Sequence, residues 1–259
     1  MSRRSFLFSS ALFAVAATTR AEAEVDPAVF KVDGRVVLRA YQALVEERLT
    51  GALYAIRALA ATSDAQTASW TSIEPALNRL SQDWKTDATI WFAMPDGSYF
   101  STAHGKSSST LLDRDYFPTL VNGHNVLGSL VISKSTGQPS IIVATPVIKM
   151  GQVVAAIGVS VSSYLVSQLI AERVEFPDDM IFYALDSKGR ASIHTEAGKV
   201  FQFPANLGDA SLQSAVATIL SQPQGSVEYS FGGYQRTAIF NKSEVIAGWH
   251  FVLVRIGKY

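Results

Sequence analysis

The chain of 259 residues contains no cysteine. This absence excludes disulfide bonds, thiolate nucleophiles and metal sites with cysteine ligands, so stability must come from an ordinary hydrophobic core. An excess of charge is also lacking, because 22 lysines and arginines balance 22 aspartates and glutamates. A chain without a positive excess is not expected to bind nucleic acid. No apolar run reaches the roughly 20 residues that a membrane-spanning helix needs.

The sequence also lacks the residue patterns of common enzymes. It has no phosphate-binding loop, no dinucleotide-binding glycine pattern and no pair of carboxylates at a spacing that would indicate acid–base catalysis. The nearest approach to the Gly-x-Ser-x-Gly nucleophile elbow of hydrolases is residues 158–162. This segment lacks the last glycine and lies along an expected strand instead of in a tight strand-to-helix turn. His104, His124, His194 and His250 are not spaced as metal ligands, which favours structural or surface roles. We therefore expect no catalysis, no metal and no cofactor.

Residues 1–23 have the three-part plan of an export signal. Arg3-Arg4 precedes an apolar run from Phe6 to Ala17, and residues 21–23 are spaced like a cleavage site. The paired arginines resemble the twin-arginine type of signal. We expect cleavage after Ala23 and a periplasmic location, with an uncleaved N-terminal membrane anchor as the alternative. Cleavage would leave 19 basic and 21 acidic residues.

Residues 24–61 are expected to form a long N-terminal helix. Apolar residues recur at three- and four-residue steps from Pro27 to about Ala61, with a start signal at Asp26-Pro27. A helix of some 35 residues spans roughly 50 Å. It is long enough to lie along two modules, and it is a candidate surface for a homodimer.

The rest of the chain predicts two consecutive α+β modules, residues 62–162 and 163–259. In the first we expect helices at 73–84 and 115–122, strands at 89–94 and 99–102, a serine-rich loop at 105–110, and a meander of strands at 130–134, 140–146 and 153–161. In the second we expect helices at 163–173 and 210–222, and strands at 180–186, 191–195, 226–231, 235–241 and 249–256.

Five short motifs follow one another between residues 114 and 159. They are Arg114-x-Tyr116-Phe117, Ser133-x-Ser135-Thr136-Gly137-x-Pro139, Ala144-x-Pro146-Val147, Gly151-x-Val153 and Gly158-Val159. This order resembles the membrane-distal half of a double Cache domain, an extracytoplasmic PAS-like ligand sensor of bacterial chemoreceptors and histidine kinases. The hairpin Leu185-Asp186-x-x-Gly189-Arg190 and Gly248-Trp249 resemble the membrane-proximal half. The resemblance implies an α+β fold in which a long N-terminal helix accompanies two stacked PAS-like modules, each an antiparallel sheet flanked by helices.

Arg114 is the strongest candidate for a ligand contact, because a guanidinium group can hold a carboxylate through two parallel hydrogen bonds. A surface ion pair with Asp113 or Asp115 is the alternative. The resemblance places Tyr116 and Phe117 at the ligand. Adjacent helix residues point about 100° apart, so we favour Tyr116 as the contact and Phe117 as part of the wall.

Trp91, Tyr99 and Ser133 are further candidates, since strand alternation lets each face the pocket, although core positions suit them equally. Family members that bind amino acids carry an aspartate after the Gly-Val pair to hold the ligand's ammonium group, and this chain has Ser160 there. Val131 likewise stands where those members place a tyrosine. An unpaired, desolvated ammonium group is costly. A small organic anion, such as a carboxylate, is therefore expected instead of an amino acid.

The resemblance implies a periplasmic sensor whose first module binds a small molecule. No heptad run follows the last strand, so we expect a separate protein, such as a membrane-bound signalling protein, to read the change. One alternative is a solute-binding or scavenging accessory protein without signalling. The other is a structural module with a vestigial pocket, in which Arg114 forms a core salt bridge. The volume of the cavity near Arg114 distinguishes this last alternative, because ligand sites usually occupy roughly 300 Å³ or more.

Overall fold

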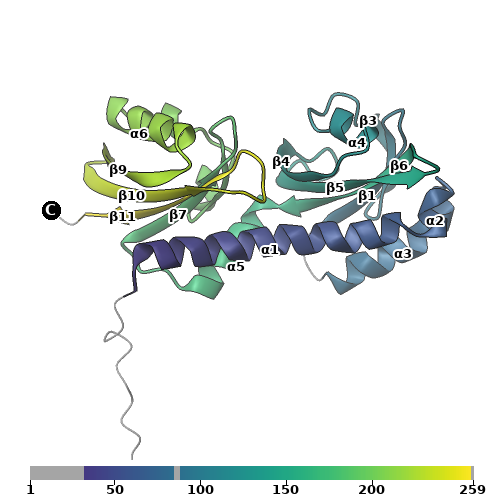
Figure 1. The fold of residues 1–259 in the computed structure, drawn as a ribbon, viewed down its shortest axis with the longest axis horizontal. Coiled ribbons are helices and arrows are strands. Elements are labelled where there is room, and N and C mark those ends of the chain that lie inside the picture. Colours follow the sequence, from purple (N-terminus) through teal and green to yellow (C-terminus); the bar gives the residue numbers. More distant parts are fainter. Residues whose placement is uncertain (1–31, 85–87, 258–259) are drawn as a thin grey trace, which may run out of the picture. The chain divides into compact units, whose positions relative to one another are not determined.

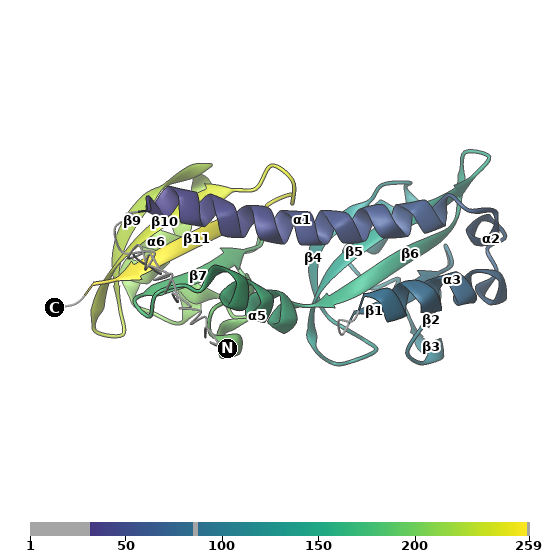
Figure 2. The same ribbon diagram turned by 90° about the horizontal axis from the view of Figure 1, so that it is seen from below.

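The long helix α1 (Gly34–Ala60) runs along both sheets of the molecule (Figures 1 and 2). In this computed structural model, which describes residues 32–84 and 88–257, the Asp33 carboxylate caps the helix by accepting the Arg35 N–H at 2.8 Å. The predicted start at Asp26-Pro27 lies outside the described residues, but Val32 and Asp33 are not helical. The helix therefore has 27 residues instead of the expected 35. Its buried apolar residues keep the predicted three- and four-residue steps: Leu38, Tyr41, Val45, Leu49, Ala52, Leu53, Ile56 and Ala60.

One antiparallel sheet has the strand order β3-β2-β1-β6-β5-β4, and we refer to this sheet with its helices as the first module. Its strands are β1 (Thr89–Ala93), β2 (Ser98–Ser101), β3 (Gly105–Thr110), β4 (Val126–Ile132), β5 (Pro139–Lys149) and β6 (Gln152–Ser162). Its helices are α2 (Ser63–Gln66), α3 (Trp70–Asp83) and α4 (Phe117–Val121). The predicted meander is confirmed as β4, β5 and β6, although β4 begins and ends earlier than expected.

The serine-rich segment Gly105–Thr110, predicted as a loop, is strand β3. It lies at the edge of the sheet beside β2, and most of its side chains are exposed. Neither face of this strand is buried, so its sequence has no apolar alternation from which a strand could be predicted. Backbone pairing with β2 alone defines it.

The other antiparallel sheet has the strand order β8-β7-β11-β10-β9, and we refer to this sheet with its helices as the second module. Its strands are β7 (Met180–Leu185), β8 (Ala191–His194), β9 (Gln224–Phe231), β10 (Tyr234–Lys242) and β11 (His250–Ile256). Its helices are α5 (Ser163–Val174), α6 (Ala210–Ser221) and the short 3-10 helices η2 (Ala197–Lys199) and η3 (Pro204–Asn206). Helix α6 covers the face of this sheet that points away from α1 (Figure 1).

Helix α1 joins the cores of both modules. It contacts β4, β5 and β6 in the first sheet and β10 and β11 in the second. Tyr41, which is fully buried, anchors the helix to the second sheet. Its hydroxyl donates to the carbonyl oxygen of Tyr183 at 2.8 Å and accepts the N–H of Val252 at 2.7 Å. The fold is therefore α+β, with a long helix and two sheets flanked by helices.

Within the described part of the chain, no helix has both the length and the apolar composition that crossing a membrane requires.

Candidate functional site

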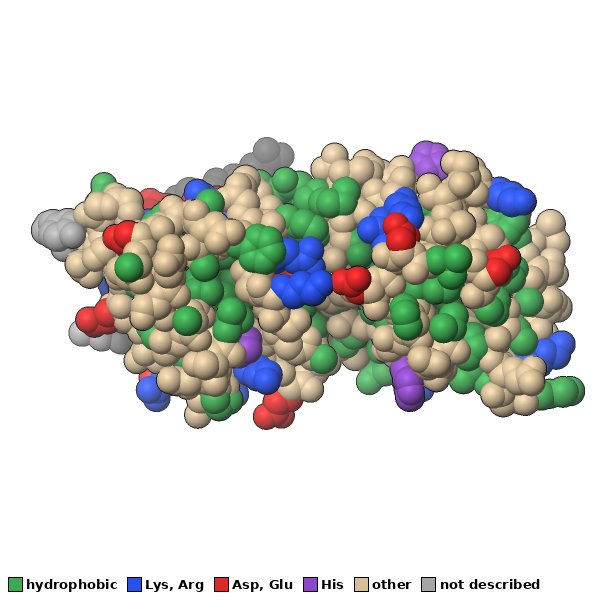
Figure 3. All heavy atoms as spheres, turned by 90° about the horizontal axis from the view of Figure 1, so that it is seen from above, with side chains coloured by type: hydrophobic (Ala, Val, Ile, Leu, Met, Phe, Trp, Pro, Cys, Tyr) green, Lys and Arg blue, Asp and Glu red, His purple; other side chains and the backbone are tan. Residues whose placement is uncertain are grey.

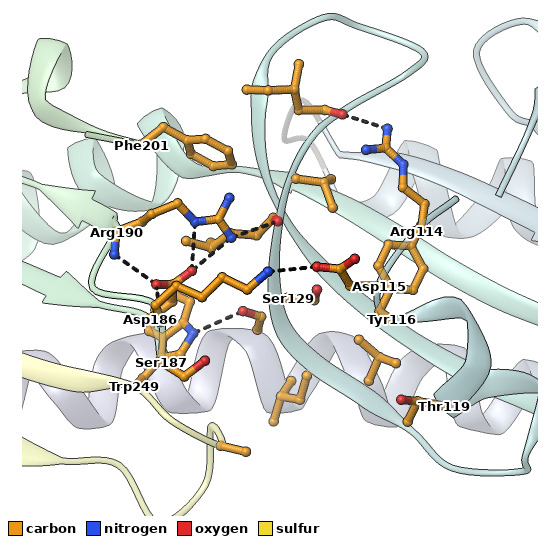
Figure 4. Close-up of a pocket in the computed structure, with 18 of the residues that line it drawn as sticks. Arg114, Asp115, Tyr116, Thr119, Ser129, Asp186, Ser187, Arg190, Phe201 and Trp249 are labelled. Carbon is orange, nitrogen blue, oxygen red and sulfur yellow. Dashed lines mark hydrogen bonds and ion pairs between the residues drawn. The ribbon is translucent and has the colours of Figure 1, made fainter. Parts of the chain in front are cut away.

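A cleft of about 700 Å³ lies between the two modules, and Figure 4 shows the side chains around it. The first module contributes residues 113–116 and strand β4. The second module contributes the β7–β8 turn, residues 186–190, together with Phe201, Phe203, Ala247 and Trp249. Figure 3 shows basic and acidic side chains next to one another near the middle of the molecule. The volume lies in the range of small-molecule sites, roughly 300–1,000 Å³.

Each carboxylate that lines the cleft has its own cationic partner. Asp113 accepts from Lys134 at 2.6 Å, Asp115 from Lys188 at 2.7 Å, and Asp186 from Arg190 at 2.9 Å. The hydrogen bond from Lys188 lowers the pKa of Asp115, and the bond from Lys134 lowers that of Asp113. Each of these three acids is therefore already occupied by a neighbouring cation.

Arg114 stands apart from these pairs. Its guanidinium donates to the carbonyl oxygen of Ile132 in β4 at 2.7 Å. Among the described residues it forms no ion pair with a carboxylate, so the predicted alternative of a pair with Asp113 or Asp115 is wrong. The side chain is half-buried at the cleft. The remaining guanidinium N–H groups are available to an anion.

Tyr116 also lines the cleft and is buried next to Trp91, with ring centroids 6.3 Å apart. Burial raises the pKa of the Tyr116 phenol well above its usual value. A phenol that stays protonated can donate a hydrogen bond to a bound acceptor. Figure 4 shows Tyr116 on the same side of the cleft as Arg114, with Arg190 and Phe201 opposite.

Strand β4 connects the cleft to the second module through its backbone. The indole N–H of Trp249 donates to the carbonyl oxygen of Gly128 at 3.0 Å, and Arg190 donates to that of Leu130 at 3.3 Å. Gly128 has φ +90°, and a Cβ at this position would lie 2.3 Å from Ile246 Cγ2. Glycine is therefore required where the second module packs against this strand.

The other predicted site residues do not line the cleft. Trp91, Tyr99 and Phe117 are buried together in the core between the first sheet and α4. The Ser133 hydroxyl accepts the N–H of Thr136 and so stabilises the β4–β5 turn. Ser160 is buried within β6. The structure thus brings Arg114 and Tyr116 to the cleft, whereas the roles of the other five in binding stay predictions.

Sequence reasoning missed the contribution of the second module. Asp186 and Arg190 belong to a hairpin motif that is recognisable in the sequence, and Trp249 follows a recognisable glycine. Nothing in their local pattern indicates that they face Arg114, which lies far away along the chain. Only the packing of the two modules brings them together.

Two of the four histidines lie in the second module, His194 half-buried and His250 buried. Burial, with the charges of Lys199 and Arg236, lowers the pKa of His194 to about 4, and burial also lowers that of His250. His104 and His124 are exposed. No group of three or more histidine, aspartate or glutamate side chains within residues 32–84 and 88–257 is arranged to hold a metal ion.

His194 predicts a loss of stability in mild acid. Its folded-state pKa lies below the value of about 6.5 for an unfolded chain, so protons bind preferentially to the unfolded chain as the pH falls. This contribution is complete above pH 6.5 and decreases toward pH 4. Between pH 7.5 and 5.0 it should cost about 2 kcal/mol.

Urea unfolding at these two pH values tests the prediction. His194→Gln should show a smaller difference between them, leaving the share of His250. His104→Gln serves as the control for loss of an imidazole at an exposed position. An unchanged pH dependence in His194→Gln would contradict the assignment.

No family model matches the chain, and no curated protein matches its sequence. Solved structures do match its fold. The ligand-binding domain of the Pseudomonas aeruginosa chemoreceptor PctB in complex with L-Gln has a TM-score of 0.69 at 15% identity, over 85% of this chain and 88% of that chain. The domain of Pseudomonas fluorescens CtaA in complex with L-alanine has a TM-score of 0.67 at 16% identity, over 87% and 94%. The domain of Campylobacter jejuni Tlp3 in complex with 4-methylisoleucine has a TM-score of 0.65 at 13% identity, over 85% and 88%.

These three structures are sensory ligand-binding domains of chemoreceptors and have the double Cache fold. The chain has the same fold, and the predicted architecture is confirmed.

Proposed function

We propose that this protein is an extracytoplasmic sensor that binds a small organic anion, with Arg114 as the anion-binding residue. The observation that carries the proposal is the charge balance of the cleft. Asp113, Asp115 and Asp186 are each paired with another cation, whereas Arg114 has no carboxylate partner among the described residues. A carboxylate ligand would complete the pairing through two parallel hydrogen bonds.

The same balance argues against an amino acid. The α-ammonium group of an amino acid needs a carboxylate partner once it leaves water. The acids that line the cleft are already occupied, and Ser160 provides no charge. Tyr116 offers a second donor for the anion, and Thr119, Asn125 and Ser129 provide neutral polar contacts.

Ligand binding would act on the second module through β4. Arg114 is bonded to Ile132 at the end of this strand, and the carbonyl groups of Gly128 and Leu130 bond to Trp249 and Arg190. A ligand that draws Arg114 into the cleft changes the environment of a strand that both modules share. The coupling can only equal the ligand's difference in affinity for the two states, typically about 1–3 kcal/mol. A separate membrane-bound signalling protein would read the change.

The proposal includes export through residues 1–23 and cleavage after Ala23. Sequencing the N-terminus of protein recovered from the periplasm tests both, and an N-terminus at Met1 would indicate the membrane-anchored alternative.

A thermal-shift screen tests binding. The protein without residues 1–23 is mixed in turn with organic acids, amino acids and amines. The Arg114→Ala variant is screened against the same compounds in parallel. A ligand at 100 times its Kd should stabilise the wild type by about 2.7 kcal/mol. Loss of a charge-assisted pair should weaken binding in Arg114→Ala by about 10- to 100-fold.

Arg39→Ala is the matched control, because Arg39 is exposed on α1 and does not line the cleft. It removes the same charge and should bind as the wild type does. Equal binding by wild type and Arg114→Ala would refute Arg114 as the anchor. A folded protein that binds no anion would favour the vestigial pocket.

A further inference from the structure

The second module contributes aromatic side chains to the cleft around Arg114. Phe201, Phe203 and Trp249 line it, and Figure 4 shows Phe201 on the opposite side of the cleft from Arg114 and Tyr116. Trp249 is fully buried, whereas Phe201 is half-buried and Phe203 is 38% exposed. The rings of Phe201 and Phe203 are therefore accessible from the cleft.

The backbone of Phe201 is held in the left-handed region, with φ +70°. Its N–H donates to the carbonyl oxygen of Ala191 at 2.8 Å, and the N–H of Ala191 donates to the carbonyl oxygen of Gln202, also at 2.8 Å. The guanidinium group of Arg190 lies over the ring, 5.1 Å from its centroid. A residue other than glycine rarely adopts this backbone conformation unless its surroundings impose it. The ring of Phe201 is therefore fixed at the cleft before a ligand arrives.

The charged side chains of the cleft can accommodate one further negative charge. Lys134, Lys188 and Arg190 each already bind one of its carboxylates. Among the described residues that line the cleft, Arg114 is the cation without a carboxylate partner. A ligand with two carboxylates would bring a second charge out of water with no free cation to receive it, and this desolvation is costly. A ligand with a single carboxylate fits the balance.

The volume of the cleft, about 700 Å³, is much larger than a carboxylate group needs. Binding sites for small molecules bury most of the ligand's surface, mainly against hydrophobic and aromatic side chains. Leu127 and Val131 of β4 add apolar surface to that of Phe201 and Phe203. The body of the ligand is therefore expected to be apolar.

We propose that the ligand of this cleft is an aromatic monocarboxylate, with its carboxylate on Arg114 and its ring against Phe201 and Phe203. The inference rests on the proposed function, and it adds the class of the acid and the part of the second module in binding it. Aromatic rings attract one another in offset or edge-to-face arrangements, beyond the effect of the apolar area that they bury. Such a ligand contacts both modules at once, so its binding links them.

Calorimetric titration of the purified full chain with sodium 3-phenylpropanoate and sodium acetate tests the proposal. Both acids carry one carboxylate, and only the first has a ring. The wild type should bind 3-phenylpropanoate at least about 10-fold more tightly than acetate, because burial of the ring adds to the affinity. Phe201→Leu and Phe203→Ala should each weaken binding of 3-phenylpropanoate by about 5-fold and leave that of acetate unchanged. Sodium succinate, which has two carboxylates, should bind no more tightly than acetate.

Two controls separate a specific effect from a loss of folding. Phe100→Leu makes the same substitution as Phe201→Leu at a half-buried residue of β2 that does not line the cleft, and it should bind both acids as the wild type does. Unchanged acetate binding in Phe201→Leu shows that its cleft is intact. The amino acid L-phenylalanine has the skeleton of 3-phenylpropanoate with an added ammonium group. It should bind the wild type at least about 10-fold more weakly than 3-phenylpropanoate, because that group would lack a partner.

The outcomes distinguish this inference from the proposed function. Equal affinity for acetate and 3-phenylpropanoate, tighter binding of succinate than of 3-phenylpropanoate, or unchanged affinity for 3-phenylpropanoate in both Phe201→Leu and Phe203→Ala would overturn the aromatic ligand. Acid binding that still depends on Arg114 would then leave the proposed function standing. If Arg114→Ala binds 3-phenylpropanoate as tightly as the wild type, if no acid binds, or if L-phenylalanine binds more tightly than 3-phenylpropanoate, both are overturned.

Discussion

Replacing Gly158 with alanine is expected to lower the free energy of unfolding by about 4 kcal/mol, at the upper end of single substitutions. Gly158 in β6 is paired with Trp91 in β1, and a Cβ would lie 2.0 Å from Cζ2 of that indole. Trp91 is 3% exposed and packs against Tyr116, so its ring cannot move aside without disturbing the core beneath α4. Overpacking of this kind forces side chains and backbone out of their preferred positions.

Urea unfolding of the wild type and of Gly158→Ala measures this difference in the free energy of unfolding. Gly51→Ala is the matched control, because no atom lies within 4 Å of its added Cβ on helix α1. Alanine is the better helix former, so this variant should be more stable by about 0.5–1 kcal/mol. A Gly158→Ala protein within 1 kcal/mol of the wild type would be inconsistent with Trp91 packing on β6.

Tyr41→Phe is expected to cost about 3 kcal/mol, although it removes a single oxygen atom. That oxygen accepts the N–H of Val252 and donates to the carbonyl oxygen of Tyr183, in the middle of the paired strands β11 and β7. Phenylalanine would keep the ring contacts with Phe182 and Phe251 but would leave these buried backbone groups without their partner. Unsatisfied buried groups cost about 1–3 kcal/mol each.

Thermal and urea unfolding of Tyr41→Phe should show this loss with an unchanged dependence on denaturant. Tyr54→Phe, on the same helix but 61% exposed, should stay within about 0.5 kcal/mol of the wild type. Similar stabilities for both variants would mean that the Tyr41 hydroxyl does not anchor α1 to the second sheet.

Trp91, Tyr99 and Phe117 are buried side chains whose direction was predictable from the sequence but whose surroundings were not. Strand alternation correctly places Trp91 and Tyr99 on one face of the sheet, and both contribute to the cluster that contains Phe117. Alternation along a strand predicts the face of the sheet toward which a side chain points. It does not predict which other residues pack against that side chain. Leu111, Leu120 and Val126 belong to the same cluster, so the three side chains pack in this core and their role in binding stays a prediction.

Elements without an apolar period could not be predicted either. Strand β3 is exposed on both faces, and the short helices η2 and η3 follow no repeating pattern. Strand β4 and helix α6 were predictable because each buries one regular face, and β5 and β6 because each is a continuous apolar run buried on both faces.

The sequence by itself determined the types and order of most elements, the absence of cysteine chemistry, and Arg114 as the residue to examine. These depend on composition and on periodicities within a few turns of helix or strand. Only the tertiary structure decided that Arg114 lacks a carboxylate partner while its neighbours Asp113 and Asp115 are paired, and that the second module forms half of the cleft. Pairing and cavity shape depend on residues far apart in the chain, and their positions follow from how the two modules pack on α1 and β4.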